Sequence, residues 1–197
     1  MPNWLPHMYD TLMKPLERLK FRALRKGIIQ KATGEVLEIG SGTGFNFPLY
    51  KNADKVIAIE PKAVMRDQSI SRAKESHVSI EVKDADAQEL PFADNSFDTV
   101  VGTLVLCTIP DPDKALYEIK RVCKPNGNIL FLEHVQMPHS IFAKLQNWIT
   151  PLWKRMCDGC HLNRDSLSTI KKAGFTIVQV KEYNSGFIIT IEAKNED

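Results

Sequence analysis

Residues 35–44 decide the fold: Glu35-Val-Leu-Glu-Ile-Gly40-Ser-Gly42-Thr-Gly44 is an apolar run that leads directly into three glycines at alternate positions. The apolar run is typical of a buried strand. Glycine has no Cβ and accepts positive φ, so the chain can turn sharply after the strand and expose backbone N–H groups. In an open α/β sheet such a loop lies in the crevice at the carboxyl ends of the strands, where ligands bind. The segment therefore predicts a ligand site.

Similar apolar runs recur along the chain and alternate with segments of helical spacing. This alternation predicts an α/β fold with a seven-stranded mixed sheet, mostly parallel, and helices on both faces. The five parallel strands are expected at Glu35–Ile39, Lys55–Glu60, Val78–Val82, Phe97–Gly102 and Asn128–Glu133. A helix over Ser166–Lys172 is expected to precede an antiparallel C-terminal hairpin, which consists of Phe175–Glu182, a turn at Asn184–Gly186 and Gly186–Ala193.

Length and composition fit one ordinary domain. The chain has 197 residues, of which 43% are hydrophobic and 25% charged, and no Gly/Ser/Pro-rich linker divides it. We therefore expect a single domain over 1–197, with a helical extension over 1–34 and a lid-like insertion over 136–165 that contains a helix over 139–153. The net charge of +2 does not indicate nucleic-acid binding. Because the sequence shows no export signal, we expect a cytoplasmic location.

The N-terminal extension differs from the rest in charge. Residues 1–34 carry seven Lys/Arg and two acidic residues, whereas residues 35–100 carry seven and twelve. Residues 12–26 alternate apolar and basic side chains, which predicts a basic amphipathic helix. Such a helix either packs on its own domain with its basic face in water or makes a peripheral contact with an anionic membrane surface.

Two acidic residues indicate the kind of ligand. Glu38 lies two residues before the first glycine, and an anion there is unfavourable beside a pyrophosphate but favourable beside a cationic amino group. The Gly-x-Gly-x-Gly spacing also departs from the dinucleotide motif Gly-x-Gly-x-x-Gly, so a nicotinamide dehydrogenase is disfavoured. Glu60 ends the second strand, where a carboxylate can accept two hydrogen bonds from a ribose diol. These residues favour an adenosine that carries an amino group.

Five motifs, in order along the chain, resemble those of the class I S-adenosylmethionine-dependent methyltransferases. They are Glu38–Gly44, Glu60, Asp84–Phe92, Ser96–Asp98 and Lys124–Gly127. The resemblance covers about residues 35–135 and implies a Rossmann-like fold with S-adenosylmethionine as the cofactor. Asn126 replaces the glycine that is usual in the family's Lys-Pro-Gly-Gly turn, and because asparagine tolerates left-handed geometry we expect the turn to form.

The resemblance assigns parts of the cofactor to particular residues. It implies that the glycine loop and Glu38 hold the methionine part, that Glu60 binds the ribose and that Asp86 accepts from the adenine amine. Thr103 would border the methionine end. The cofactor-binding residues that it implies are Glu38, Gly40, Ser41, Gly42, Gly44, Glu60, Pro61, Met65, Asp86, Ala87 and Thr103.

The C-terminal part resembles one branch of this family, the methyltransferase-like thiol methyltransferases and their bacterial relatives. The matching residues are Glu133-His134-Val135 and the Asp-Gly-Cys turn within Cys157–Ser166. The stretch Gly42–Tyr50 is also similar to bacterial phospholipid N-methyltransferases. Because no N-terminal hydrophobic anchor like that of the animal thiol methyltransferases is recognised, their lipid-droplet or reticulum location is not expected to carry over.

The same branch implies acceptor contacts at the end of the fifth strand. We predict Glu133 and His134 there as catalytic residues, since an imidazole can take a proton from an acceptor at neutral pH. A strand-end histidine with ordinary hydrogen bonds, and an Asp-Gly-Cys turn that only leads into the next helix, are equally good interpretations. An apolar pocket is expected to close around the acceptor. The expected substrate residues are Tyr9, Trp148, Asp158 and Cys160.

The cysteine spacing predicts no metal site. Cys157-Asp-Gly-Cys160-His161 matches the haem-attachment pattern, but covalent haem attachment requires export. A four-cysteine zinc site needs two close pairs, whereas Cys107 and Cys123 are sixteen residues apart. Redox chemistry at the Cys157/Cys160 pair stays a minor alternative.

The function predicted from the sequence is S-adenosylmethionine-dependent transfer of a methyl group to a small, hydrophobic acceptor, with a thiol favoured by the resemblance of the C-terminal part. One alternative is a phospholipid or quinone-type methyltransferase at the membrane surface. Another is a non-catalytic module that binds S-adenosylmethionine. The sequence does not indicate an oligomeric state.

Overall fold

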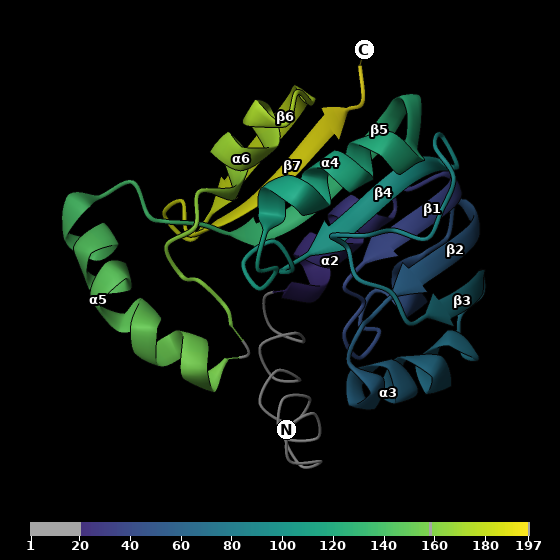
Figure 1. Ribbon diagram of the computed structural model, residues 1–197, viewed down its shortest axis with the longest axis horizontal. Coiled ribbons are helices and arrows are strands. Elements are labelled where there is room, and N and C mark those ends of the chain that lie inside the picture. Colours follow the sequence, from purple (N-terminus) through teal and green to yellow (C-terminus); the bar gives the residue numbers. More distant parts are fainter. Residues whose placement is uncertain (1–20, 158, 197) are drawn as a thin grey trace.

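The computed structural model describes residues 21–157 and 159–196, which form a seven-stranded sheet (Figure 1). The strand order is β3-β2-β1-β4-β5-β7-β6. The first five strands pair in parallel, and β7 pairs antiparallel with both β5 and β6. The predicted Rossmann-like mixed sheet is therefore confirmed. The strands are β1 Gly34–Ile39, β2 Ala53–Ile59, β3 Ser79–Lys83, β4 Phe97–Thr103, β5 Cys123–His134, β6 Thr176–Tyr183 and β7 Ile188–Lys194.

Helices cover both faces of the sheet because successive strand residues point to opposite sides. Leu37 and Ile39 of β1 belong to one buried cluster, which also contains side chains of α4 and α6. Val36 of the same strand belongs to the other cluster, with side chains of α2 and with Phe47 and Tyr50. The helices are α2 Arg22–Ile29, η2 Phe47–Leu49, α3 Ala63–Ala73, α4 Pro112–Val122, α5 Ser140–Met156 and α6 Ser166–Lys172.

The C-terminal half follows the expected order of helix and hairpin. The turn between β6 and β7 has positive φ at Asn184, Ser185 and Gly186 (51°, 57° and 83°), as a tight left-handed turn requires. Asn126 also has positive φ, at 60°, so the Lys-Pro-Asn-Gly turn forms as expected. The strand β5 nevertheless begins at Cys123, five residues before the predicted start, because the chain pairs with β4 on both sides of a bulge.

The helix α5 stands apart from the rest of the molecule. Figure 1 shows it extending away from the sheet, beyond the ends of β5 and β7. Its main attachment is Gln146, whose amide donates to the backbone oxygens of Val135 and Leu162 and accepts from the Met137 N–H. The expectation that the insertion over 136–165 acts as a lid stays a prediction.

The basic amphipathic helix predicted over 12–26 lies partly outside the described residues. Helix α2 ends three residues beyond the predicted 26 and buries Arg25, Ile28 and Ile29. No helix in the described part of the chain is both long enough and apolar enough to cross a membrane.

Candidate functional site

The candidate site lies at the edge of the sheet where the parallel strands end. The strand order places β1 beside β4, although β2 and β3 lie between them in the sequence. This is the topological switch point at which open α/β sheets bind ligands. Glu38, Glu60, Thr103 and Glu133 stand at or next to the carboxyl ends of β1, β2, β4 and β5. The sheet therefore gathers predicted site residues from four strands at one edge.

The glycine loop leaves open space beyond the end of β1. A Cβ at Gly40 would lie 2.3 Å from Val105 Cγ2, and one at Gly44 would lie 2.8 Å from a phenylalanine ring, so both glycines permit close packing. Gly42 differs, because its φ is +54° and a Cβ there would meet no atom within 4 Å. The Ser41 hydroxyl is buried and has no hydrogen-bond partner among the described residues. An open glycine beside an unpartnered buried hydroxyl fits a loop that contacts a ligand.

Glu38 lies in a buried polar network at the base of this loop. Its carboxylate accepts hydrogen bonds from the Tyr50 hydroxyl (2.7 Å) and the Asn46 amide (2.9 Å). Arg25 of α2 donates to Asn46 and to the Thr103 hydroxyl at the end of β4. Burial raises the pKa of Glu38 to about 7, although both hydrogen bonds and the Arg25 charge lower it. The network thus holds a carboxyl that ionises near neutral pH.

Glu60 is fixed in orientation just after β2. Its Oε2 accepts from the backbone N–H of Gly42 (2.9 Å), and its Oε1 accepts from that of Lys62 (3.0 Å). Each carboxylate oxygen keeps a second lone pair, so the group can also accept from a ribose diol. The neighbouring predicted residues differ in burial, since Pro61 is exposed and Met65 half-buried.

Asp86 lies farther along this edge, in the segment after β3. Its side chain is exposed, and its carboxylate accepts from the Gln88 backbone N–H (2.8 Å) and side-chain amide (3.0 Å). Ala87 beside it is buried. Arg66 of α3 braces the segment, because it pairs with Asp84 and donates to the backbone carbonyl that follows β2. An adenine amine at Asp86 would share the carboxylate with Gln88.

Glu133 and His134 end β5 with buried side chains. Glu133 Oε1 accepts from the backbone N–H groups of Val105 (3.0 Å) and Leu106 (3.1 Å), which fixes the loop after β4. Burial raises the pKa of Glu133 to about 7 against the effect of these two donors. His134 Nε2 lies 3.1 Å from Cys160 Sγ. Glu133 Oε2 and His134 Nδ1 have no partner in the described part of the chain, as expected of groups that await a ligand.

A third residue, Cys107, joins His134 and Cys160. One ligand atom of each lies within 4.8 Å of the others, and all three residues are buried. A hydrogen bond from Cys107 lowers the pKa of the Cys160 thiol, with His134 adding to this effect, whereas the same bond and burial raise the pKa of Cys107. The spacing of the cysteines along the sequence does not indicate this group, because its third member is a histidine. The available signal was that Cys107 closely follows β4 and that His134 ends the neighbouring parallel strand β5.

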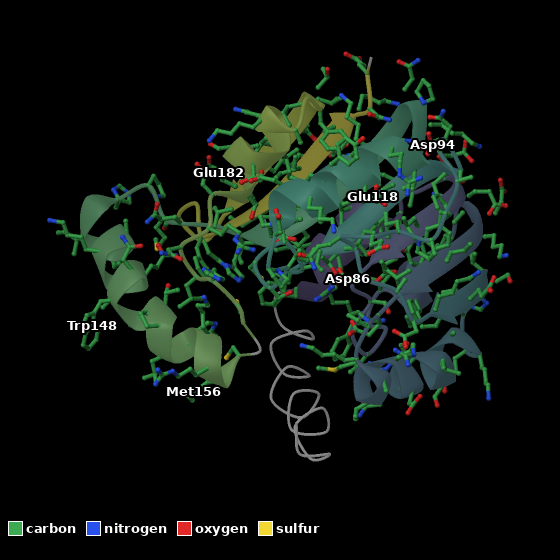
Figure 2. The ribbon with its side chains drawn as sticks, viewed as in Figure 1. Asp86, Asp94, Glu118, Trp148, Met156 and Glu182 are labelled. Atoms are coloured by element: carbon green, nitrogen blue, oxygen red, sulfur yellow. The ribbon has the colours of Figure 1, made fainter. Side chains whose placement is uncertain are left out.

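Trp148, the other predicted substrate residue that the structure describes, does not join this group. Trp148 is 79% exposed, and Figure 2 shows it on the side of α5 that faces away from the sheet. In this structure α5 turns Gln146 and Thr150 inward, so the expectation that Trp148 lines the acceptor site stays a prediction. Tyr9 and Asp158 lie outside the described residues.

The residues present at this edge fit S-adenosylmethionine. Gly42 leaves open space and Ser41 an unpartnered hydroxyl for the methionine part, and Glu38 offers a carboxyl for its amino group. Glu60 presents an oriented carboxylate for the ribose. When bound, the cofactor supplies an electrophilic methyl group on a sulfonium.

Comparisons with known proteins agree with this arrangement. The chain matches a methyltransferase domain family over residues 37–131. It is 38% identical over 192 residues to thiol S-methyltransferase TMT1B of Rattus norvegicus, which covers 91% of this chain and 78% of the rat protein. It is 34% identical over 103 residues to phosphatidylethanolamine N-methyltransferase of Cereibacter sphaeroides, which covers 51% of each chain. An S-adenosylmethionine-dependent methyltransferase structure from Aquifex aeolicus superposes with a TM-score of 0.64 at 20% identity, covering 96% of this chain and 97% of that chain.

The sequence similarity and the structural similarity support different conclusions. The Aquifex aeolicus structure shows the fold alone, because the identity is only 20%. The alignment with the rat protein extends over most of both chains and well beyond the matched domain, so it shows common family membership. The chain therefore belongs to the class I S-adenosylmethionine-dependent methyltransferases and is an enzyme that uses S-adenosylmethionine as its methyl donor.

Proposed function

We propose that the chain transfers the methyl group of S-adenosylmethionine to the sulfur of a small, hydrophobic thiol. The observation that carries this proposal is the 38% identity to a thiol S-methyltransferase over 91% of this chain. An alignment of that extent includes α5 and the turn after it as well as the segment that contains the cofactor-binding residues Glu38 to Thr103. The Asp-Gly-Cys turn and Glu133-His134 lie in the C-terminal half of the chain, on the side where an acceptor is expected.

The cofactor residues take the roles that their positions allow. Glu38 binds the amino group, Gly42 and Ser41 contact the methionine part, and Glu60 binds the ribose hydroxyls. Asp86 accepts from the adenine amine. The remaining residues, Gly40, Gly44, Pro61, Met65, Ala87 and Thr103, shape the walls of the same site.

A thiol acceptor suits the side chains at the acceptor side of the site, which come from the C-terminal half of the chain. Transfer from a sulfonium is an in-line displacement, so the protein mainly aligns the acceptor sulfur, the methyl group and the sulfonium. A free thiol has a pKa near 8.5, so its thiolate is a minor species at neutral pH. Glu133 and His134, at the end of β5, lie near Cys160. They would stabilise the acceptor thiolate or take the proton of the acceptor thiol.

The test is the release of S-adenosylhomocysteine from the purified protein with a panel of alkyl thiols, amines, phenols and phosphatidylethanolamine vesicles. Release with thiols is expected. Glu60→Ala should weaken cofactor binding about a hundredfold, since it removes two charge-assisted hydrogen bonds. The matched control is Glu75→Ala, at an exposed position after α3. Release only with amines or lipid would contradict the thiol proposal.

A second candidate function is methylation of a lipid at a membrane surface, and the exposed side of α5 favours it. Six apolar side chains of this helix are about half or more exposed: Ile141, Phe142, Leu145, Trp148, Leu152 and Met156. The helix carries basic residues and no acidic ones. Exposed apolar and basic side chains on one helix are typical of peripheral contact with an anionic bilayer. In the same assay, release that depends on lipid vesicles would favour this candidate.

A further inference from the structure

Three side chains with metal-binding atoms meet at the acceptor side of the sheet edge. Cys107 comes from the loop after β4, His134 from the end of β5, and Cys160 from the turn after α5. Their ligand atoms lie within 4.8 Å of one another, and His134 Nε2 is 3.1 Å from Cys160 Sγ. Two sulfurs and an imidazole thus converge from three distant parts of the chain.

Specific hydrogen bonds hold this convergence in place. The backbone N–H of His161 donates to the Cys107 carbonyl at 2.9 Å, so the residue after Cys160 is tied to Cys107 itself. The Arg164 guanidinium donates to the backbone carbonyls of Leu106 and Ile109, on either side of Cys107. The turn after α5 is therefore fastened to the loop after β4, and the two sulfurs stay together.

The geometry and the ligand type both fit Zn²⁺. Tetrahedral zinc holds sulfur at about 2.3 Å and nitrogen at about 2.0 Å, which places neighbouring ligand atoms about 3.5 to 3.8 Å apart. The His134 Nε2 to Cys160 Sγ distance of 3.1 Å is slightly shorter than these values, and no pair of the three ligand atoms is more than 4.8 Å apart. Thiolates and imidazole suit zinc, whereas calcium and magnesium prefer oxygen. Two thiolates also neutralise a divalent ion, which lowers the cost of burying it.

We propose that Cys107, His134 and Cys160 bind one Zn²⁺ ion, and that its fourth position takes the sulfur of the acceptor thiol. The role of the fourth position rests on the proposed thiol methylation. Three protein ligands with one open position are the pattern of catalytic rather than structural zinc. It makes His134 a metal ligand in place of a proton acceptor. The site lies next to the glycine loop, since Gly40 packs against Val105, two residues before Cys107.

The transfer step then balances without a further reactant. The acceptor R–SH releases its proton to water as its sulfur binds the metal as a thiolate, which zinc favours as it favours hydroxide over water. A lone pair of that sulfur forms the new S–CH₃ bond while the sulfonium S–CH₃ bond breaks. The electron pair of the broken bond stays on the sulfur of S-adenosylhomocysteine. The product R–S–CH₃ is a neutral thioether, a weaker ligand than a thiolate, so it can leave.

Cobalt substitution tests the site independently of activity. The full chain is reduced with a phosphine, stripped of metal and titrated with Co²⁺, and thiolate-to-cobalt absorption is measured. We expect one equivalent to bind, and Zn²⁺ to displace it. Adding an alkyl thiol should raise the charge-transfer absorption by about half, because a third thiolate joins two.

Serine variants identify the ligands. Cys160→Ser and Cys107→Ser should each remove most of the thiolate absorption, and Cys160 is the safer position because it lies nearer the surface. Cys157→Ser is the matched control, since Cys157 lies three residues from Cys160 but outside the group. Circular dichroism and S-adenosylhomocysteine binding establish that each variant is folded.

The outcomes separate this inference from the proposed function. Absence of stoichiometric metal binding, or binding that needs Cys157, overturns the metal site even if thiols are methylated. Metal binding whose spectrum does not change with thiol overturns the role of the fourth position. If the metal binds and the spectrum responds, but no thiol is methylated, the site stands and the proposed function fails.

Discussion

At Glu38, burial and hydrogen bonding act in opposite directions on the pKa of one carboxyl. Burial dominates and raises its pKa to about 7. A cationic amino group binds the ionised form, so S-adenosylhomocysteine should bind about tenfold more tightly at pH 8 than at pH 6. Calorimetry across this pH range, in buffers of different ionisation enthalpy, measures both the affinity and the proton released. Glu38→Gln should remove this pH dependence, whereas Glu35→Gln on the same strand should retain it.

The same carboxyl should influence stability with the opposite pH trend. A folded-state pKa raised from 4.5 to about 7 gives a contribution that is fully present below pH 4.5 and lost as the pH rises through 7. For Glu38 the loss is on the order of 3 kcal/mol in the unliganded protein. Urea unfolding of the wild type and of Glu38→Gln at each pH isolates this contribution, because Glu133 titrates in both. If the free energy of unfolding changed equally with pH in the wild type and in Glu38→Gln, the prediction would be contradicted.

At the scale of elements, local sequence patterns predicted the helices and strands. They did not predict which distant segments contact one another. The run 35–44, the helix Ser166–Lys172 and the hairpin all form as expected, since apolar spacing and glycine act within a few residues. Sequence placed Glu38 and Glu60 correctly at strand ends for the same reason. It could not pair Cys107 with Cys160, because their contact depends on how the turn after α5 returns to the loop after β4.

Arg164 should hold the turn after α5 against the loop after β4. Its guanidinium donates to the backbone carbonyls of Leu106 and Ile109, so Arg164→Met would leave both carbonyls without these donors. We expect a loss of about 2 to 3 kcal/mol in the free energy of unfolding. Amide exchange in 104–109 and 160–164 should also become faster. Arg155→Met, on exposed α5, should change neither the free energy of unfolding nor the exchange rates. Unchanged exchange in the Arg164 variant would show that Arg164 does not hold the turn after α5 against the loop after β4.

At the scale of the whole molecule, α5 exposes an apolar surface that the sheet does not cover. The spacing of its apolar residues identified the helix, but spacing alone does not tell whether an apolar stripe packs inward, and here Trp148 is 79% exposed. Figure 1 shows the helix extending clear of the fold. An exposed apolar and basic helix is costly in water unless a surface binds it.

The expected surface is an anionic bilayer, and adding negative charge to the exposed apolar side of α5 tests it. The wild type should cosediment with vesicles that contain phosphatidylglycerol, and Trp148→Glu with Leu152→Glu should reduce this binding at least about tenfold, since it removes buried apolar area and adds repulsion. Val178→Glu is the matched control, because Val178 is an apolar side chain of β6 that is 63% exposed and distant from α5 in the sequence. Equal losses in both variants would indicate nonspecific adsorption. Retained binding of S-adenosylhomocysteine in the α5 variant would show that membrane contact and cofactor binding are separate properties of the molecule.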